Sequence, residues 1–308
     1  MSTSIKNVAV LGGSGTLGPS IITALLDAGY TVTVLTRAEK TSPSNFPEGV
    51  RVVPVDYSSV DSLKSALSGQ DAVVSTLAGV AVGQPQRNAI DAALAVGVKR
   101  FIPSEFGINT RQVRGTPIAQ ILAGKIATVD YLEELAAKNE GFTWTGVTTG
   151  LFFDSGLDRF GLKTINLDSK TASVVDSGNE RFYASTLAQV GRAVVHILQH
   201  PAETANKYLA IASFNLSQNE LIKVVEELTG QEYPVTSRAN SAELQKVGEE
   251  KLAKGDYSAF LELLTVHLHA DGAGNALAAE KSANALIGLP YEDLKTEVAA
   301  WLKRKNVL

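Results

Sequence analysis

Cysteine is absent from the 308-residue chain. Without thiols the protein can form no disulfide, bind no zinc through thiolates and use no cysteine nucleophile. The remaining soft ligands are four histidines. Of these, His267 and His269 flank a single residue, but no third ligand is evident, and a zinc site needs three or four. We therefore expect no metal site.

Basic residues are not in excess, and long hydrophobic runs are missing. The formal net charge is -4 and the sequence pI is about 5.7, which gives no basic field to attract a phosphodiester backbone. No stretch approaches the roughly 18 apolar residues that cross a bilayer. The short apolar run near the N-terminus ends in glycines, as a buried strand does, and not in a signal-peptide cleavage site. We expect a cytoplasmic protein that binds neither nucleic acid nor membranes.

The first half of the chain contains an alternation of short β-branched runs and longer segments of helical period. This pattern is typical of βαβ units around a parallel sheet. An apolar stripe that ends at Gly29 and a segment opened by Pro85 and closed by Gly97 predict helices, and Ser58 and Asp61 are spaced to cap another. The predicted strands cover residues 7–11, 31–35, 51–55, 72–75, 100–103 and 143–147. Together they predict an α/β fold with a doubly wound, Rossmann-type parallel sheet.

The second half has a different pattern, because the alternation weakens beyond about Leu151 and turn residues multiply. Ser217 and Glu220 form a capping box before an apolar helix that should stop at Gly230. A last helix is expected near residues 292–302. These features predict a Rossmann domain over residues 1–155 and a smaller α+β lobe over residues 156–308, and leave open whether segments of that lobe return to the first sheet.

A glycine run, Gly12-Gly13-Ser14-Gly15-Thr16-Leu17-Gly18, follows the first predicted strand and opens the first predicted helix. It fits two registers, one that starts at Gly12 and one that starts at Gly13, and both continue through Gly15 and Gly18. A dinucleotide needs a tight turn, a side-chain-free approach to its diphosphate and N–H groups at a helix start. The strand–turn–helix context favours this interpretation over a plain turn. We expect Gly12, Ser14, Gly15, Thr16, Leu17 and Gly18 to bind the diphosphate of a dinucleotide.

Arg37 closes the second strand at the position, roughly 20 residues after the glycine run, where an NAD enzyme usually carries an acidic residue. A guanidinium there can hold the 2′-phosphate of NADP(H) by charge-assisted hydrogen bonds, and Lys40 is close enough in sequence to assist. A solvated arginine at a strand end is the plainer interpretation. Given the glycine run, the sequence favours NADP(H).

The segments that follow the fourth and fifth strands should face the nicotinamide, because ligands of such sheets bind outside the carboxyl ends of the strands. They include Leu77, Gln84 and Ser104, which we expect near the cofactor, and Phe106, a candidate substrate contact. Glu105 has two interpretations. It is either a catalytic acid or base, or a turn carboxylate that accepts backbone N–H bonds, which is the more common use.

Lys125 lies at the centre of an otherwise apolar helical stripe. That stripe is formed by Ile118, Ile121, Leu122, Val129, Leu132 and Ala136. Burial disfavours an ammonium and lowers the pKa of a lysine, which can then donate or accept protons near neutrality. The alternative is a lysine whose stem is buried while its ammonium reaches solvent. Spacing alone does not separate the two.

Several segments together resemble the NmrA-like and isoflavone-reductase-like group of atypical short-chain dehydrogenases. They are GGSGTLG at 12–18, VLTR ending at Arg37, VKRFIPSEFG at 98–107, Lys125 in its helix and TGLFF at 149–153. The similarity continues through 176–198 and 206–230, so it spans most of the chain. The loop INTRQVRGTP after residue 107 departs from the group by lacking an acidic stretch.

The resemblance implies an NADPH-dependent reductase that transfers hydride to a small aromatic or conjugated substrate. In this group the lysine matching Lys125 is the general acid/base and lies beside the cofactor, Gln84 matches a glutamine near the cofactor, and Phe152 and Phe153 become candidate substrate contacts. The group also contains proteins that bind the dinucleotide without turnover. The alternative is therefore a redox-sensing regulator that binds NADP(H) and docks on a partner protein.

Overall fold

The computed structural model describes residues 5–38, 46–158 and 164–308. Its larger lobe is built on a seven-stranded sheet in the order β11-β6-β5-β4-β1-β2-β3, in which all neighbours are parallel. The strands are β1 (Asn7–Leu11), β2 (Thr31–Arg37), β3 (Arg51–Val55), β4 (Ala72–Ser75), β5 (Arg100–Ile102), β6 (Thr143–Thr148) and β11 (Lys207–Ala210). The strand order reverses between β1 and β4, and a doubly wound sheet binds its ligand at this kind of switch point.

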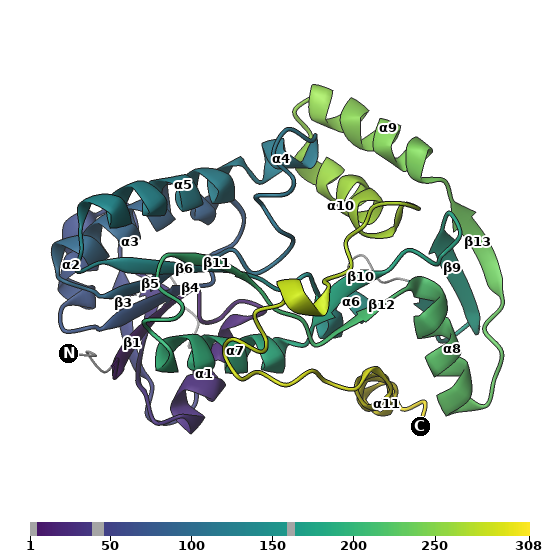
Figure 1. Cartoon of the computed structure of the whole chain (residues 1–308), viewed down its shortest axis with the longest axis horizontal. Helices are drawn as coiled ribbons and strands as arrows, with labels where there is room; N and C mark the ends of the chain where they lie inside the picture. Colours follow the sequence, from purple (N-terminus) through teal and green to yellow (C-terminus); the bar gives the residue numbers. More distant parts are fainter. Residues whose placement is uncertain (1–4, 39–45, 159–163) are drawn as a thin grey trace.

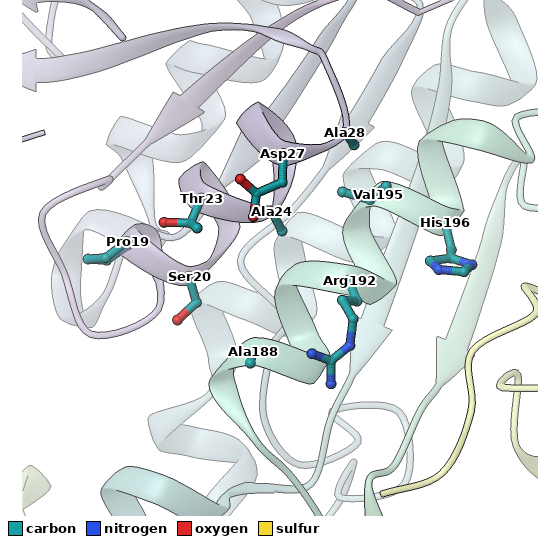
Figure 2. A pocket seen from close by; sticks show the side chains of 10 residues that line it. All are labelled: Pro19, Ser20, Thr23, Ala24, Asp27, Ala28, Ala188, Arg192, Val195 and His196. Carbon is teal, nitrogen blue, oxygen red and sulfur yellow. The ribbon is translucent and has the colours of Figure 1, made fainter. Parts of the chain in front are cut away.

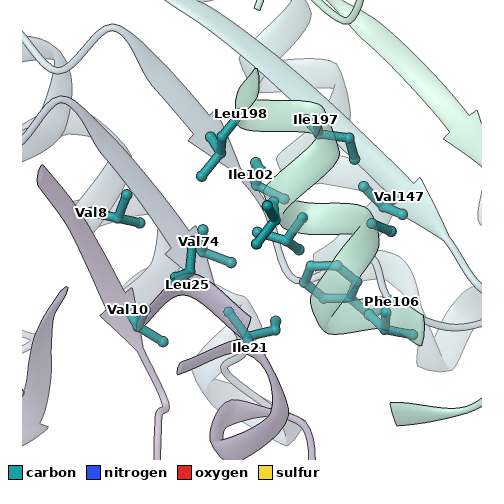
Figure 3. Close-up of a cluster of buried hydrophobic side chains, with 14 of the residues drawn as sticks. Val8, Val10, Ile21, Leu25, Val74, Ile102, Phe106, Val147, Ile197 and Leu198 are labelled. Carbon is teal, nitrogen blue, oxygen red and sulfur yellow. The ribbon is translucent and has the colours of Figure 1, made fainter. Parts of the chain in front are cut away.

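Helices cover both faces of this sheet (Figure 1). On one face lie α1 (Gly18–Asp27) and α7 (Leu187–Gln199), and on the other lie α2 (Val60–Leu67), α3 (Gln84–Ala95) and α5 (Ala123–Lys138). Figure 3 shows Ile21 and Leu25 of α1 against Val8, Val10 and Val74 of the sheet, all of them buried. The strands are therefore apolar on both faces, as expected for a sheet sandwiched between helices.

The smaller lobe contains two three-stranded sheets and its own apolar core. One sheet consists of β7 (Leu151–Phe152), β10 (Phe182–Ser185) and β12 (Phe214–Leu216), and the other of β8 (Ile165–Asn166), β9 (Thr171–Val175) and β13 (Val235–Ala239). Its helices are α4 (Ile118–Ile121), α6 (Phe153–Asp158), α8 (Gln218–Thr229), α9 (Ser241–Ala253), α10 (Phe260–His269) and α11 (Leu294–Arg304). Among the described residues, no helix is both long and apolar enough to cross a membrane.

Most of the local predictions for the first half are confirmed. Each predicted strand occurs, with its ends shifted by only one or two residues. The capping box of α8 is present at Ser217 and Glu220, and Gly230 ends that helix in the left-handed conformation. The cap predicted at Ser58 is wrong by one residue. Ser59 caps α2 by accepting the Ser62 N–H at 3.2 Å, while Ser58 bonds the Asp56 carboxylate.

Three segments from the second half of the chain contribute to the larger lobe: α7, β11 and the stretch that carries Ala283, Ile287 and Leu289. β11 extends the parallel sheet beside β6, and α7 packs against α1. The two helices approach closely because Gly191 faces Ser20, whose carbonyl oxygen would lie 2.5 Å from any Cβ at position 191. The chain thus leaves the larger lobe after β6, returns for α7 and β11, and returns once more at residues 283–289.

Candidate active site

The glycine run forms the turn between β1 and α1. Gly12 has φ +76°, and a Cβ there would lie 2.8 Å from the Thr76 carbonyl. Gly18 has no room either, since its Cβ would lie 2.3 Å from the Gly13 carbonyl oxygen. Gly15 differs, because it is exposed and the nearest atom to its Cβ would be the Gly12 oxygen at 3.2 Å. Two glycines are therefore needed for the fold, whereas Gly15 leaves open the surface at the turn.

Two residues that sequence reasoning missed hold this turn. Thr76, just after β4, directs both its N–H and its hydroxyl to the Leu11 carbonyl, each at 2.8 Å. The Tyr57 hydroxyl donates to the Leu35 carbonyl at 3.0 Å and accepts the Gly12 N–H. Burial raises the pKa of Tyr57, and the hydrogen bond from Gly12 and the charge of Arg37 oppose that rise. Neither residue lies in the glycine motif, so only the fold brings them to it.

Arg37 is the last residue of β2 and is exposed. It lies on the same side of the sheet as the glycine turn, since β1 and β2 are parallel neighbours with Leu11 opposite Leu35. An exposed guanidinium at this edge is free to bind an anion beside the turn. Lys40 lies outside the described residues.

The segments after β4 and β5 are bonded to each other. Ser104 donates its hydroxyl to the Leu77 carbonyl at 2.6 Å, so two residues predicted to lie near the cofactor do meet. The predicted role of Gln84 near the cofactor stays a prediction. It begins α3 with an exposed side chain whose amide bonds Asn88 at 2.8 Å. The buried glutamine of this region is Gln86, whose Oε1 accepts the Ser104 N–H at 3.0 Å.

Lys125 lies in the first turn of α5, which starts at the carboxyl edge of the sheet. The single helix assumed for its apolar stripe is wrong, because the chain breaks at Leu122 between α4 and α5. Ile118 belongs to the core of the smaller lobe, whereas Val129 and Leu132 belong to that of the larger. Lys125 thus lies at the junction of the two cores and not in the middle of one face.

Burial lowers the pKa of Lys125, and the negative charge of Glu105 opposes this shift. Lys125 lies near the positive end of the α5 dipole, which also disfavours the ammonium and therefore lowers the pKa further. The side chain keeps part of its surface exposed. Within the described part of the chain, no hydrogen bond or ion pair to its ammonium is found. A half-buried amine with a lowered pKa and no fixed partner is suited to proton transfer.

Glu105 is fully buried, and its charge acts on Lys125. Its Oε2 accepts the hydroxyls of Thr110 at 2.5 Å and Tyr208 at 2.7 Å, and among the described residues no donor reaches Oε1. The donors are side-chain hydroxyls, whereas the sequence indicated backbone N–H groups. Burial and the Glu105 charge both raise the pKa of Tyr208 well above its ordinary value. Glu105 therefore ties the loop after β5 to Thr110 and to Tyr208 of β11.

The phenylalanines proposed as substrate contacts have different environments. Phe106 is 6% exposed and lies in the core of the larger lobe near Val147 (Figure 3). Phe153 is 1% exposed and packs edge-on against Phe214, with ring centroids 4.8 Å apart. Phe152, which pairs with Ser185 in the smaller lobe, remains partly exposed. Of the three side chains, Phe152 alone offers substantial surface to a ligand.

One hollow lies on the larger lobe and another on the smaller lobe. One, of about 600 Å³, runs between the outer faces of α1 and α7 and is lined by residues such as Ser20, Asp27, Arg192 and His196 (Figure 2). None of its lining residues comes from the loops after β4 and β5. The other, of about 380 Å³, lies in the smaller lobe. Its lining consists of Thr116, Pro117, Ile118, Gln245, Leu263, Val266, His267, Ala270, Asp271, Gly272, Ala273 and Asn275.

His267 and His269, the histidine pair considered as metal ligands, lie on α10. Burial lowers the pKa of His267, and the His269 ring packs against Phe182 with centroids 4.8 Å apart. Across residues 5–38, 46–158 and 164–308, no group of three or more potential ligand side chains is arranged to hold a metal ion.

Comparison with known sequences identifies close oxidoreductase relatives. Oxidoreductase aprR of Aspergillus flavus is 37% identical over 96% of this chain and 98% of its own. Oxidoreductase poxI of Penicillium oxalicum is 35% identical over 94% and 92%. The isoflavone reductase homolog IRL of Zea mays is 27% identical over 82% and 84%.

Solved structures share the whole fold. AtPrR2 with NADP+ and (+)pinoresinol superimposes with a TM-score of 0.76 at 22% identity, over 98% of this chain and 100% of that one. The leucoanthocyanidin reductase–NADPH complex from Vitis vinifera gives 0.77 at 18% identity, over 96% and 99%. These similarities establish the α/β Rossmann-type architecture.

The NmrA-like family model matches residues 4–249, and the chain therefore belongs to the NmrA-like family, together with oxidoreductases and isoflavone reductase homologues.

Proposed function

We propose that this protein is an NADPH-dependent reductase of small aromatic or conjugated compounds. The observation that carries the proposal is Lys125, a half-buried amine with a lowered pKa at the same sheet edge as the glycine turn. Relatives at 35% and 37% identity are named oxidoreductases. Two of the solved structures of similar fold are complexes with NADP+ or NADPH.

The residues at the turn fit a dinucleotide diphosphate. Gly15 is exposed and has no side chain to block the approach, and the turn leads directly into the N-terminus of α1, where N–H groups favour an anion. Ser14 and Thr16 are exposed beside it. Arg37 is the residue proposed to bind the 2′-phosphate, because its guanidinium ends the neighbouring strand and is open to solvent. This arrangement supports NADPH over NADH.

When bound, NADPH supplies a hydride to the acceptor carbon of the substrate. Reduction then requires one proton, and Lys125 is proposed to deliver it from its ammonium to the atom on which negative charge develops. Burial lowers the pKa of Lys125 and makes its ammonium a stronger acid, while the charge of Glu105 opposes this shift. The neutral amine takes up a proton from solvent before the next cycle.

The hollow of the smaller lobe is the proposed site for the distal part of the substrate. Its volume of about 380 Å³ suits part of a small molecule. Its wall includes Ile118, at the start of α4 just before the Lys125 helix, apolar side chains of α10, and polar side chains such as Gln245 and Asp271. Phe152 remains a candidate contact nearer the cofactor. One neighbour was solved with (+)pinoresinol, a phenolic compound, and this favours phenolic candidates.

The test is to measure NADPH and NADH affinity by fluorescence titration, followed by NADPH oxidation against a panel of phenolic and conjugated carbonyl compounds. The proposal predicts tighter binding of NADPH and multiple turnovers with at least one compound. Equal affinity for both cofactors would contradict the role of Arg37. Tight binding of one redox form without turnover, together with a recoverable protein partner, would instead support a redox-sensing regulator.

A further inference from the structure

One buried side chain joins three of the segments that surround Lys125. Gln86, on α3, is 1% exposed. Its Oε1 accepts the Ser104 N–H at 3.0 Å, and its Nε2 donates to the Val82 carbonyl at 3.4 Å and to the Thr128 hydroxyl at 3.3 Å. The amide thereby links the loop after β4, the end of β5 and helix α5.

Thr128 continues this link into the helix turn that carries Lys125. Its hydroxyl donates to the Gly124 carbonyl at 2.8 Å and also lies 3.4 Å from the Val82 carbonyl. Thr128 is three residues beyond Lys125, so the two occupy neighbouring positions on one helix face. The Thr128 hydroxyl therefore joins the peptide before Lys125, through the Gly124 carbonyl, to the buried Gln86 amide.

The start of α5 lacks the usual means of holding a first turn. No side chain caps it at Leu122, and its second residue is Gly124, a poor helix former. A first turn of this kind frays unless tertiary contacts hold it. The Gln86–Thr128 bridge, anchored at Ser104, provides such a contact at the turn where Lys125 lies.

We infer that Gln86 and Thr128 are positioning residues that fix the Lys125 ammonium relative to the nicotinamide edge of the sheet. The inference rests on the proposed role of Lys125. Neither residue transfers a proton or contacts the reacting atoms. Their effect on the reaction is geometric, because misplacing a catalytic group by about 1 Å can cost roughly 100-fold in rate.

The test uses the nearly isosteric substitution Thr128→Val, which removes the hydroxyl, and Thr128→Ser, which keeps it. Both are made in the wild type and in Lys125→Met, and single-turnover NADPH oxidation and NADPH affinity are measured. Thr128→Val should lower the hydride-transfer rate by about 10- to 100-fold and leave NADPH affinity within about twofold, with Thr128→Ser restoring the rate. In the Lys125→Met background Thr128→Val should have no further effect.

An equal loss from Thr128→Val in both backgrounds would overturn the inference, because the hydroxyl would then act without Lys125. So would failure of Thr128→Ser to restore the rate. If Thr128→Val fails to fold, Gln86→Met is put through the same cycle. If Lys125→Met itself leaves turnover unchanged, the proposed role of Lys125 fails and this inference fails with it. A large loss from Lys125→Met with none from Thr128→Val overturns the positioning role alone.

Discussion

Substituting alanine at two glycines of the same turn should separate cofactor binding from folding. At Gly15 the added methyl lies 3.2 Å from one oxygen, and the residue does not have a positive φ, so the protein tolerates alanine. Gly→Ala at an unstrained position stabilises by about 0.4–1 kcal/mol through the unfolded state, and here the close contact with the Gly12 oxygen opposes that gain. The methyl does, however, occupy the surface through which a diphosphate must reach the backbone. Losing one charge-assisted hydrogen bond, about 1.5–3 kcal/mol, weakens NADPH binding by about 10- to 100-fold.

Gly18→Ala is the matched control. Its methyl would lie 2.3 Å from the Gly13 carbonyl oxygen, so the backbone must move. Overpacking of this kind costs about 1–3 kcal/mol, and the melting temperature should fall. The assay is NADPH titration combined with thermal unfolding without cofactor. Gly15→Ala should lose affinity at unchanged or higher melting temperature, and Gly18→Ala should lose stability. Full NADPH affinity in Gly15→Ala would refute the assignment of this turn to the diphosphate.

Three further changes test the charges around the site. Arg37→Ala should weaken NADPH binding by about 10- to 100-fold and leave NADH affinity unchanged, since only NADPH carries the 2′-phosphate; parallel titrations decide this. Glu105→Gln removes the charge that supports the Lys125 ammonium, so the Lys125 pKa falls further and the basic limb of the pH–rate profile moves to lower pH; an unmoved limb argues against the coupling. Lys125→Met should raise the melting temperature at neutral pH. The pKa of Lys125 is lower in the folded state than in the unfolded chain, where it is about 10.4, so the ammonium destabilises the folded state below that pH. The gain in melting temperature from Lys125→Met should therefore shrink as the pH rises toward about 10.4.

The sequence predicts the larger lobe well because that lobe consists of repeated local units. Each strand of the first half is a short β-branched run bounded by turn residues, and each boundary is encoded within a few positions. The glycine turn is also encoded locally in part, since Gly18 lies against Gly13 of the same turn at a distance that excludes a side chain, whereas the close contact of Gly12 is with the distant Thr76. β11 and α7 were not assigned to this lobe, because their place beside β6 and α1 depends on contacts between distant parts of the chain.

The site was harder to predict where it depends on tertiary contacts. Helical periodicity placed Lys125 inside one long helix, but the break at Leu122 divides the stripe between two cores. A helical wheel cannot detect such a break, because both halves keep the same period. Gln84 was predicted from its place after the fourth strand and from the family resemblance, and neither indicated that Gln86, two residues further on, is the buried partner of the loop after β5. Tyr57 gave no sequence signal, since its contact with Gly12 arises only when the strands are aligned.

The most direct test of the reductase mechanism compares wild type and Lys125→Met. For both, NADPH affinity is measured by titration, and NADPH oxidation is followed with a substrate that the wild type turns over. General acid–base catalysis contributes about 100- to 10,000-fold. We predict a loss of that size in Lys125→Met with NADPH affinity nearly unchanged. Turnover at the wild-type rate in Lys125→Met would contradict the account.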